Sequence, residues 1–179
     1  MNRESIWLLA VFIAVWAGVV DWRYHRIPNW LTVTGLVAGL VLNGVVGGWA
    51  GAKASLLGAA LGIGVIFPFY LLRAMGGGDW KLVGAIGGIL GPGRLWDVLF
   101  VAVIAAGVFA LVMVIAKGRA GETLHNIGSM MGSLARMQMP GPEVSLDNPK
   151  SARIPFGVSV AIAVVLYAGL ETWRVLGRA

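Results

Sequence analysis

Apolar and polar positions are segregated into long blocks along this chain, and charged residues gather between the apolar blocks. A helix that crosses the hydrocarbon core of a bilayer needs about 20 predominantly apolar residues, or about 17 at the short end. Six stretches meet or approach that length: 5–21, 30–49, 54–72, 79–92, 96–116 and 154–171. The pattern predicts an all-α integral membrane bundle of about six transmembrane helices.

The length requirement places two aspartates in the ends of predicted helices. The stretch 5–21 is long enough only if Asp21 belongs to it. The stretch 79–92 is interrupted by glycines and is too short for a span unless it begins at Asp79. An ionisable residue at the edge of a hydrocarbon span is costly and usually has a function, so both carboxylates are candidates for a site.

The longest polar stretch, 117–153, lies between the last two predicted spans and divides into two halves. In the first half, side chains recur on one stripe at helical spacing: Leu124, Ile127, Met131, Leu134 and Gln138. Such a stripe predicts an amphipathic helix that lies in the membrane interface. The second half is rich in proline, and we predict a loop there.

The composition leaves too little polar surface for a water-soluble fold. Hydrophobic residues make up 58% of the chain and charged residues only 12%, whereas soluble domains carry about 25% charged residues. We therefore expect a single transmembrane domain over residues 1–179. The net charge of +6 arises from basic residues in short loops, which indicates contact with the lipid bilayer and argues against nucleic-acid binding.

Residue usage also limits the chemistry of a site. The chain has no cysteine, which excludes a thiolate nucleophile and a cysteine-ligated zinc module. With only two histidines, His25 and His125, a histidine-based metal site is not expected. We therefore expect neither a metal nor a cofactor.

The placement of basic residues predicts the orientation of the bundle. If the N-terminus lies outside, the loops 22–29, 73–81 and 117–153 are cytoplasmic and hold nine of the 14 lysines and arginines. Because cytoplasmic loops are enriched in Lys and Arg, this orientation is favoured, with both termini outside. It places Asp21 and Asp79 at the cytoplasmic ends of their helices.

Two carboxylates at one membrane face allow peptide hydrolysis without a metal. One carboxylate takes a proton from water while the other donates a hydrogen bond to the scissile carbonyl, because two like charges about 3 Å apart do not both ionise. Each aspartate also has a purely structural interpretation. Asp79 could cap the helix that follows it, and Asp21 could pair with Arg23 or Arg26.

The residues around Asp79 bear on the same hypothesis. Gly76, Gly77 and Gly78 precede the aspartate, and glycine lets the backbone take positive φ and approach a bound chain closely. Lys81 follows two positions later. Its ammonium group could lower the cost of ionising the carboxylate pair, or it could extend to lipid headgroups.

Three motifs resemble those of one known family. They are D-x-x-x-x-x-I-P-N-x-x-T (Asp21, Ile27, Pro28, Asn29 and Thr32), G-G-G-D-x-K-L (Gly76 to Leu82) and R-I-P-F-G (Arg153 to Gly157). In this order they resemble the prepilin peptidases, also called type IV leader peptidases, which are membrane aspartic proteases with a G-x-G-D motif. The motifs extend from residue 21 to residue 157 and so cover most of the chain.

The resemblance implies an activity, a substrate and a site. Asp21 and Asp79 would be the catalytic pair, and Gly76, Gly77, Gly78 and Lys81 would position the substrate or support the site. The substrates would be prepilins and pseudopilins, whose short basic leader ends in glycine and precedes an apolar helix. Cleavage would take place at the cytoplasmic face of the cytoplasmic (inner) membrane.

The chain departs from the larger members of that family in the loop after Asp21. Those members carry a cysteine-bearing domain between their first spans, whereas the loop from Asp21 to Trp30 has no room for such a domain. Methylation of the new amino terminus, the second activity of the larger enzymes, is therefore not expected. The compact form resembles the peptidases of tight-adherence (Flp) pili or the archaeal preflagellin peptidases.

Two functions of other classes remain as alternatives. The chain could be a small transporter or channel in which the short glycine-broken span lines an ion path. Against this, the sequence has no internal repeat and no charge near the middle of a predicted span. The chain could also be a non-catalytic assembly subunit of a secretion or pilus machine, and its oligomeric state is left open.

Overall fold

The computed structural model describes residues 3–72, 74–118, 120–136 and 155–177, and these residues form helices joined by short connections. The helices are α1 (Arg3–Tyr24), α2 (Asn29–Leu71), α3 (Asp79–Leu90), α4 (Pro92–Ala116), α5 (Ala120–Ala135) and α6 (Phe156–Leu176). The all-α class is confirmed. Four helices are long and apolar enough to cross a membrane in the described part of the chain, namely α1, α2, α4 and α6.

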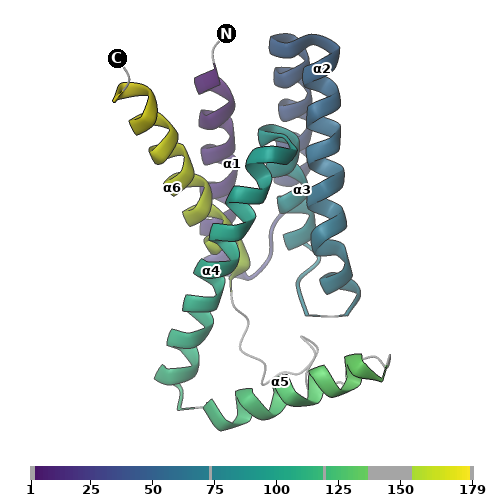
Figure 1. Cartoon of the computed structure of the whole chain (residues 1–179), viewed down its shortest axis with the longest axis vertical. Helices are drawn as coiled ribbons and strands as arrows, with labels where there is room; N and C mark the ends of the chain where they lie inside the picture. Colours follow the sequence, from purple (N-terminus) through teal and green to yellow (C-terminus); the bar gives the residue numbers. More distant parts are fainter. Residues whose placement is uncertain (1–2, 73, 119, 137–154, 178–179) are drawn as a thin grey trace.

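Helix α2 consists of two arms that lie side by side and meet at one end (Figure 1). The break lies at Gly48, whose φ of 57° and ψ of −145° are not helical. A Cβ atom at Gly51 would overlap the carbonyl oxygen of Asn43, so a glycine is required where the arms come together. The two arms correspond to the predicted spans 30–49 and 54–72, although the gap expected between those spans is almost entirely helical.

Helix α3 is buried by its neighbours although it is short. Its 12 residues correspond to about 18 Å, which is less than the hydrocarbon core of a bilayer. It is therefore not among the four candidate spans, which corrects the expectation for 79–92. Every residue from Leu82 to Leu90 is buried. Near its C-terminal end, Asn43 and Ser55 of the α2 arms donate hydrogen bonds to the Gly88 carbonyl, at 3.2 and 2.6 Å.

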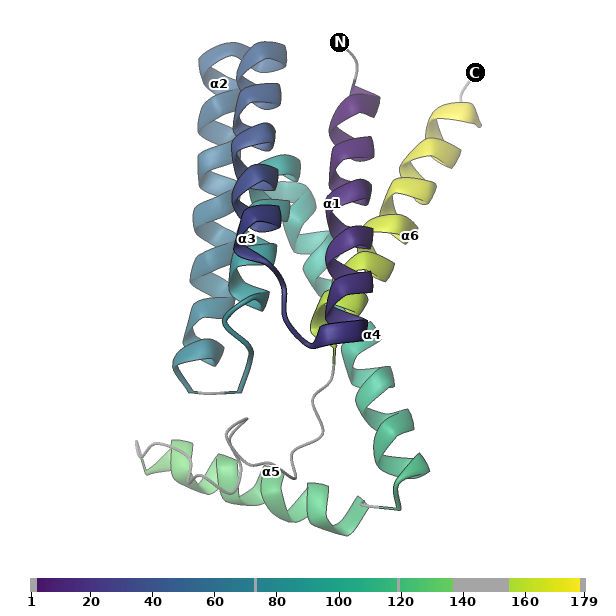
Figure 2. The same ribbon diagram turned by 180° about the vertical axis from the view of Figure 1, so that it is seen from behind.

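The helices form a bundle with both chain ends on the same side. In Figures 1 and 2, α1, the arms of α2, α3 and α6 run along the long axis, and the C-terminal end of α1 lies beside the start of α6. The outer surface of the bundle carries large apolar side chains; Val41, Phe100 and Ile115 are among those more than half exposed. An apolar exterior of this kind is what contact with lipid requires.

Helix α5 lies across the end of the bundle opposite the chain termini (Figure 2). It is the helix expected in the first half of 117–153, and among the described helices it contacts α4. Three apolar side chains of the predicted stripe are exposed, namely Leu124, Ile127 and Met131. The other described helices therefore do not cover the apolar face of α5. The side chain of Leu134, residue Gln138 and the predicted proline-rich loop lie outside the described residues.

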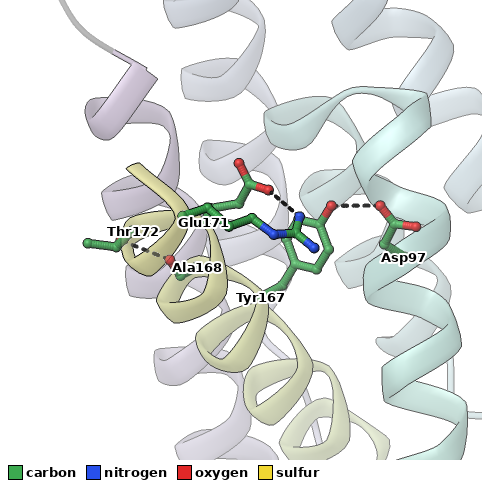
Figure 3. Close-up of polar contacts among 6 residues, drawn as sticks. Asp97, Tyr167, Ala168, Glu171 and Thr172 are labelled. Carbon is green, nitrogen blue, oxygen red and sulfur yellow. Dashed lines mark hydrogen bonds and ion pairs between the residues drawn. The ribbon is translucent and has the colours of Figure 1, made fainter. Parts of the chain in front are cut away.

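A polar cluster ties the helices together near the chain termini (Figure 3). The Tyr167 hydroxyl of α6 donates a hydrogen bond to the Asp97 carboxylate of α4 at 2.7 Å. The ring of Tyr167 packs against that of Trp7 in α1, with their centroids 5.5 Å apart. Because Trp7 lies in the N-terminal part of α1 and Asp21 in its last turn, this cluster is remote from the two candidate aspartates.

Candidate active site

Asp21 lies in the last turn of α1, where its side chain is only 6% exposed. Its Oδ2 atom accepts a hydrogen bond of 2.8 Å from the backbone amide of Gly157, the second residue of α6. The first amides of a helix have no partner within the helix and carry the positive end of its dipole. The start of α6 therefore stabilises the Asp21 carboxylate. Within the described residues, Asp21 forms no ion pair with Arg23 or Arg26, so that alternative is wrong.

Asp79 is the first residue of α3, and its side chain turns back to the preceding loop. Its Oδ2 atom accepts a hydrogen bond of 2.9 Å from the Gly76 amide, and its own amide donates to the Gly76 carbonyl at 3.2 Å. The N-cap position of α3 belongs to Gly78, and no side chain caps the helix. The capping interpretation of Asp79 is therefore wrong, because its carboxylate satisfies the loop and not the helix.

The glycines before Asp79 provide space rather than an unusual backbone. Positive φ was expected for them, but the described glycines with positive φ are Gly48, Gly91 and Gly118. A Cβ atom at Gly78 would lie 2.9 Å from Cβ of Ile27, and one at Gly76 would lie 3.2 Å from Oδ2 of Asp79. These glycines are therefore needed because the loop packs closely on the first motif and on the aspartate itself.

Two contacts join the first motif to the second. Ile27 is buried against Gly78, and the Lys81 ammonium donates a hydrogen bond of 2.9 Å to the side-chain oxygen of Asn29. Asn29 is the first residue of α2, so the connection between α1 and α2 is held beside the start of α3. The sequence suggested that Lys81 acts on the carboxylates or on lipid headgroups. In the structure its ammonium group contacts Asn29 and lies 5.4 Å from the centroid of the Trp80 ring.

The two carboxylates come from helices that pack against one another. Helix α1 contacts α3, and the charge of Asp21 acts repulsively on Asp79. Each carboxylate is held through its Oδ2 atom by one glycine amide. Asp79 thus lies at the N-terminal end of α3 and Asp21 beside the N-terminal end of α6, where helix dipoles reduce the cost of negative charge. Two carboxyl groups in neighbouring helices are the groups that general acid and base catalysis by aspartates requires.

Gly157 is the residue whose contribution the motif alone did not reveal. It belongs to the R-I-P-F-G segment, to which the sequence assigned no role at the site. Its contact with Asp21 joins residues 136 positions apart. A local pattern carries no signal for such a contact, because the contact depends on how α1 and α6 cross.

The fold and the site define a class: a multi-pass helical membrane protein with one carboxylate at the end of α1 and a second at the start of the buried helix α3, which packs against α1. A family model described as the type IV leader peptidase family matches residues 7–114, more than half of the chain. The chain belongs to that family. No solved structure matches it significantly.

Three relatives carry the name prepilin leader peptidase/N-methyltransferase. The protein of Neisseria gonorrhoeae is 34% identical over 107 residues, which are 56% of this chain and 37% of that protein. The Xanthomonas campestris protein is 29% identical over a region that covers 63% of this chain and 41% of that protein. The Myxococcus xanthus protein is 32% identical over a region that covers 66% of this chain and 37% of that protein. The chain thus spans about two fifths of the length of these relatives.

Proposed function

We propose that this protein is a membrane aspartic endopeptidase that removes the basic leader from prepilin-like proteins. The observation that carries the proposal is that Asp21 and Asp79, each held by a glycine amide, lie on the packed helices α1 and α3 of a chain of the type IV leader peptidase family. The names of the three relatives support prepilins as the substrate class.

The chemistry assigns complementary roles to the two carboxyl groups. The ionised group takes a proton from a water molecule, whose oxygen attacks the scissile carbonyl carbon, while the protonated group gives its proton to the carbonyl oxygen. The carboxylate that gave up its proton then takes a hydroxyl proton from the tetrahedral intermediate, while the other carboxyl group gives the proton taken from water to the leaving nitrogen. The C–N bond breaks, and both carboxyl groups return to their starting states. The glycine amides that hold the two carboxylates support this proposal, because they limit the movement of each group.

The direct test is cleavage of a prepilin by the purified protein in liposomes. We expect one cut, at the junction between the basic leader and the apolar segment, with the new amino terminus identified by sequencing. A prepilin in which a bulky residue replaces the last glycine of the leader serves as the matched control and should stay intact. Absence of any product from the unaltered prepilin would refute the peptidase function.

We propose that the site faces the cytoplasm and that both termini lie outside, an orientation that the excess of basic residues in the loops on the site's side supports. Single cysteines in place of His25 and Gly77 should therefore react with a membrane-impermeant maleimide only from the cytoplasmic side. Both positions are exposed and lie at the end of the bundle that holds the aspartates. Gly47→Cys, near the turn of α2, is the control and should react only from outside. The opposite labelling pattern would reverse the proposed orientation.

We propose that the cleaved product is left unmethylated, although the relatives are named as methyltransferases too. The loop between Asp21 and Trp30 is too short for the cysteine-bearing domain of the larger family members, and the sequence contains no cysteine. Mass spectrometry of the mature amino terminus, after incubation with S-adenosylmethionine, should show no added methyl group. The Neisseria gonorrhoeae protein is the positive control, and a methylated product from this chain would contradict the prediction.

A further inference from the structure

The start of α6 is in direct contact with the Asp21 carboxylate. The Gly157 amide donates the 2.8 Å hydrogen bond described above, and a Cβ atom at this position would lie 2.9 Å from Oδ2 of Asp21 and 3.0 Å from its Cβ. The first distance is shorter than Cβ atoms tolerate, and the second is tighter than nearly all real Cβ contacts. A side chain at position 157 would therefore occupy space that the carboxylate fills.

The close crossing of α1 and α6 prevents an easy adjustment. One turn before Asp21, a Cβ atom at Gly18 would lie 2.9 Å from Cβ of Ala161 and 3.3 Å from the Gly157 carbonyl oxygen. Small residues thus allow the two helices to touch on both sides of the hydrogen bond. Val160 is almost fully buried in the core, which holds the first turn of α6 in place. An added methyl group at position 157 can then be accommodated only by moving the Asp21 side chain or separating the helices.

A glycine amide also holds the second aspartate, Asp79. Gly76 donates its amide to Oδ2 of Asp79 at 2.9 Å, and a Cβ atom there would lie 3.2 Å from that oxygen. Both carboxylates are therefore fixed by one amide of a glycine whose missing side chain leaves them room. For Asp79 the glycine lies three residues away in the loop, whereas for Asp21 it comes from another helix.

We infer that Gly157 is a positioning residue, and that its amide and its lack of a side chain orient the Asp21 carboxylate toward Asp79. This inference rests on the proposed peptidase function of Asp21. It gives the R-I-P-F-G segment a role in the active site: the third motif holds the first, just as the second motif holds its own aspartate. Misplacing a reacting group by about 1 Å can cost about 100-fold in rate, so a single methyl group is enough to test the role.

The first test compares two alanine substitutions within α6. Gly157→Ala should lower kcat for prepilin cleavage by about 10- to 100-fold and leave KM within about twofold, because the carboxylate moves while substrate contacts elsewhere are kept. Gly169→Ala is the matched control, since a Cβ atom there meets nothing within 4 Å. It should keep the wild-type kcat. A wild-type kcat in Gly157→Ala would overturn the inference. A loss of activity that follows a lowered melting temperature would also overturn it.

The second test needs no substrate. Hydrogen–deuterium exchange of the Gly157 amide should be slow in the wild type and at least about tenfold faster in Asp21→Ala, which removes the acceptor. Asp79→Ala is the control and should leave the exchange unchanged. Equal exchange in wild type and Asp21→Ala would refute the contact itself. If exchange responds as expected but the wild type cleaves no prepilin, the proposed peptidase function fails, and the positioning of Asp21 for catalysis by Gly157 fails with it.

Discussion

Replacing either Asp21 or Asp79 by asparagine should reduce kcat for leader removal by about 100- to 10,000-fold, the range typical of removing a general acid or base. Asparagine preserves the size of the side chain and an oxygen that can accept the amide of Gly157 or Gly76. It does not take up or release the proton that the reaction requires. The loss should therefore appear in the chemical step and leave substrate binding and protein stability nearly unchanged.

The effects of the two substitutions on the cleavage rate should not be additive. Because the carboxylates act as one unit, the double variant Asp21→Asn, Asp79→Asn is expected to be no slower than the more damaged single variant. Single-turnover cleavage of a prepilin in liposomes measures these rates directly. Asp97→Asn is a suitable control, since Asp97 bonds Tyr167 in the cluster near the chain termini and should leave kcat almost unchanged. Wild-type rates for either Asp21→Asn or Asp79→Asn would rule out the carboxylate pair.

A second large effect is expected at the contact between α2 and α3. A Cβ atom at Gly58 would overlap the Gly87 carbonyl oxygen, and one at Gly87 would overlap the Gly58 carbonyl oxygen, so the two backbones touch. Gly58→Ala has no flexible side chain to push aside and must separate the helices. Overpacking of this kind destabilises proteins by about 1–3 kcal/mol and occasionally by more, and the backbone contact places Gly58→Ala at the upper end.

This loss should reach the site, because α3 carries Asp79 at its start. We expect both a lower melting temperature in detergent and reduced cleavage for Gly58→Ala. Gly64→Ala, in the same arm of α2, is the matched control, because nothing lies within 4 Å of a Cβ atom there. It should be unchanged or stabilised by up to about 1 kcal/mol, since alanine is the better helix former. Equal melting temperatures for the two variants would contradict the observed packing.

Much of the fold follows from local pattern. Apolar runs of about 20 residues predict spanning helices because, in lipid, a helix satisfies all its backbone groups within one segment. The same reasoning predicted α5 from its stripe, which contains Leu124 and Ile127. The prediction of a spanning helix over 79–92 was wrong, because the length of one segment does not show whether other helices bury it. Helix α3 can be shorter than a membrane span because the arms of α2 and other helices bury it within the bundle.

For the candidate site, too, some features follow from local sequence and others from packing. Asp21 and Asp79 were identified because charges are rare in apolar segments, and their positions follow from segment lengths. The glycines before Asp79 were identified too, but the positive φ expected for them is not found: Gly76 and Gly78 make room for Asp79 and Ile27. Their close approach to a bound substrate stays a prediction. Two local alternatives fail for different reasons: the Asp79 carboxylate accepts a hydrogen bond from the loop amide of Gly76 instead of capping α3, and the Asp21 carboxylate accepts one from Gly157 of another helix instead of pairing with an arginine.

The sequence by itself determined which segments are helical, which carboxylates lie at helix ends, and which family motifs they belong to, because these properties depend on residues close together in the chain. The tertiary structure decided what holds the Asp21 carboxylate. The hydrogen bond from Gly157 to Asp21 exists only because Gly18 and Ala161 let α1 and α6 touch, and the helix that begins with Asp79 packs against the helix that carries Asp21 only in the folded bundle. Contacts over such separations depend on the fit of whole helices, and that fit is a property of the packed bundle.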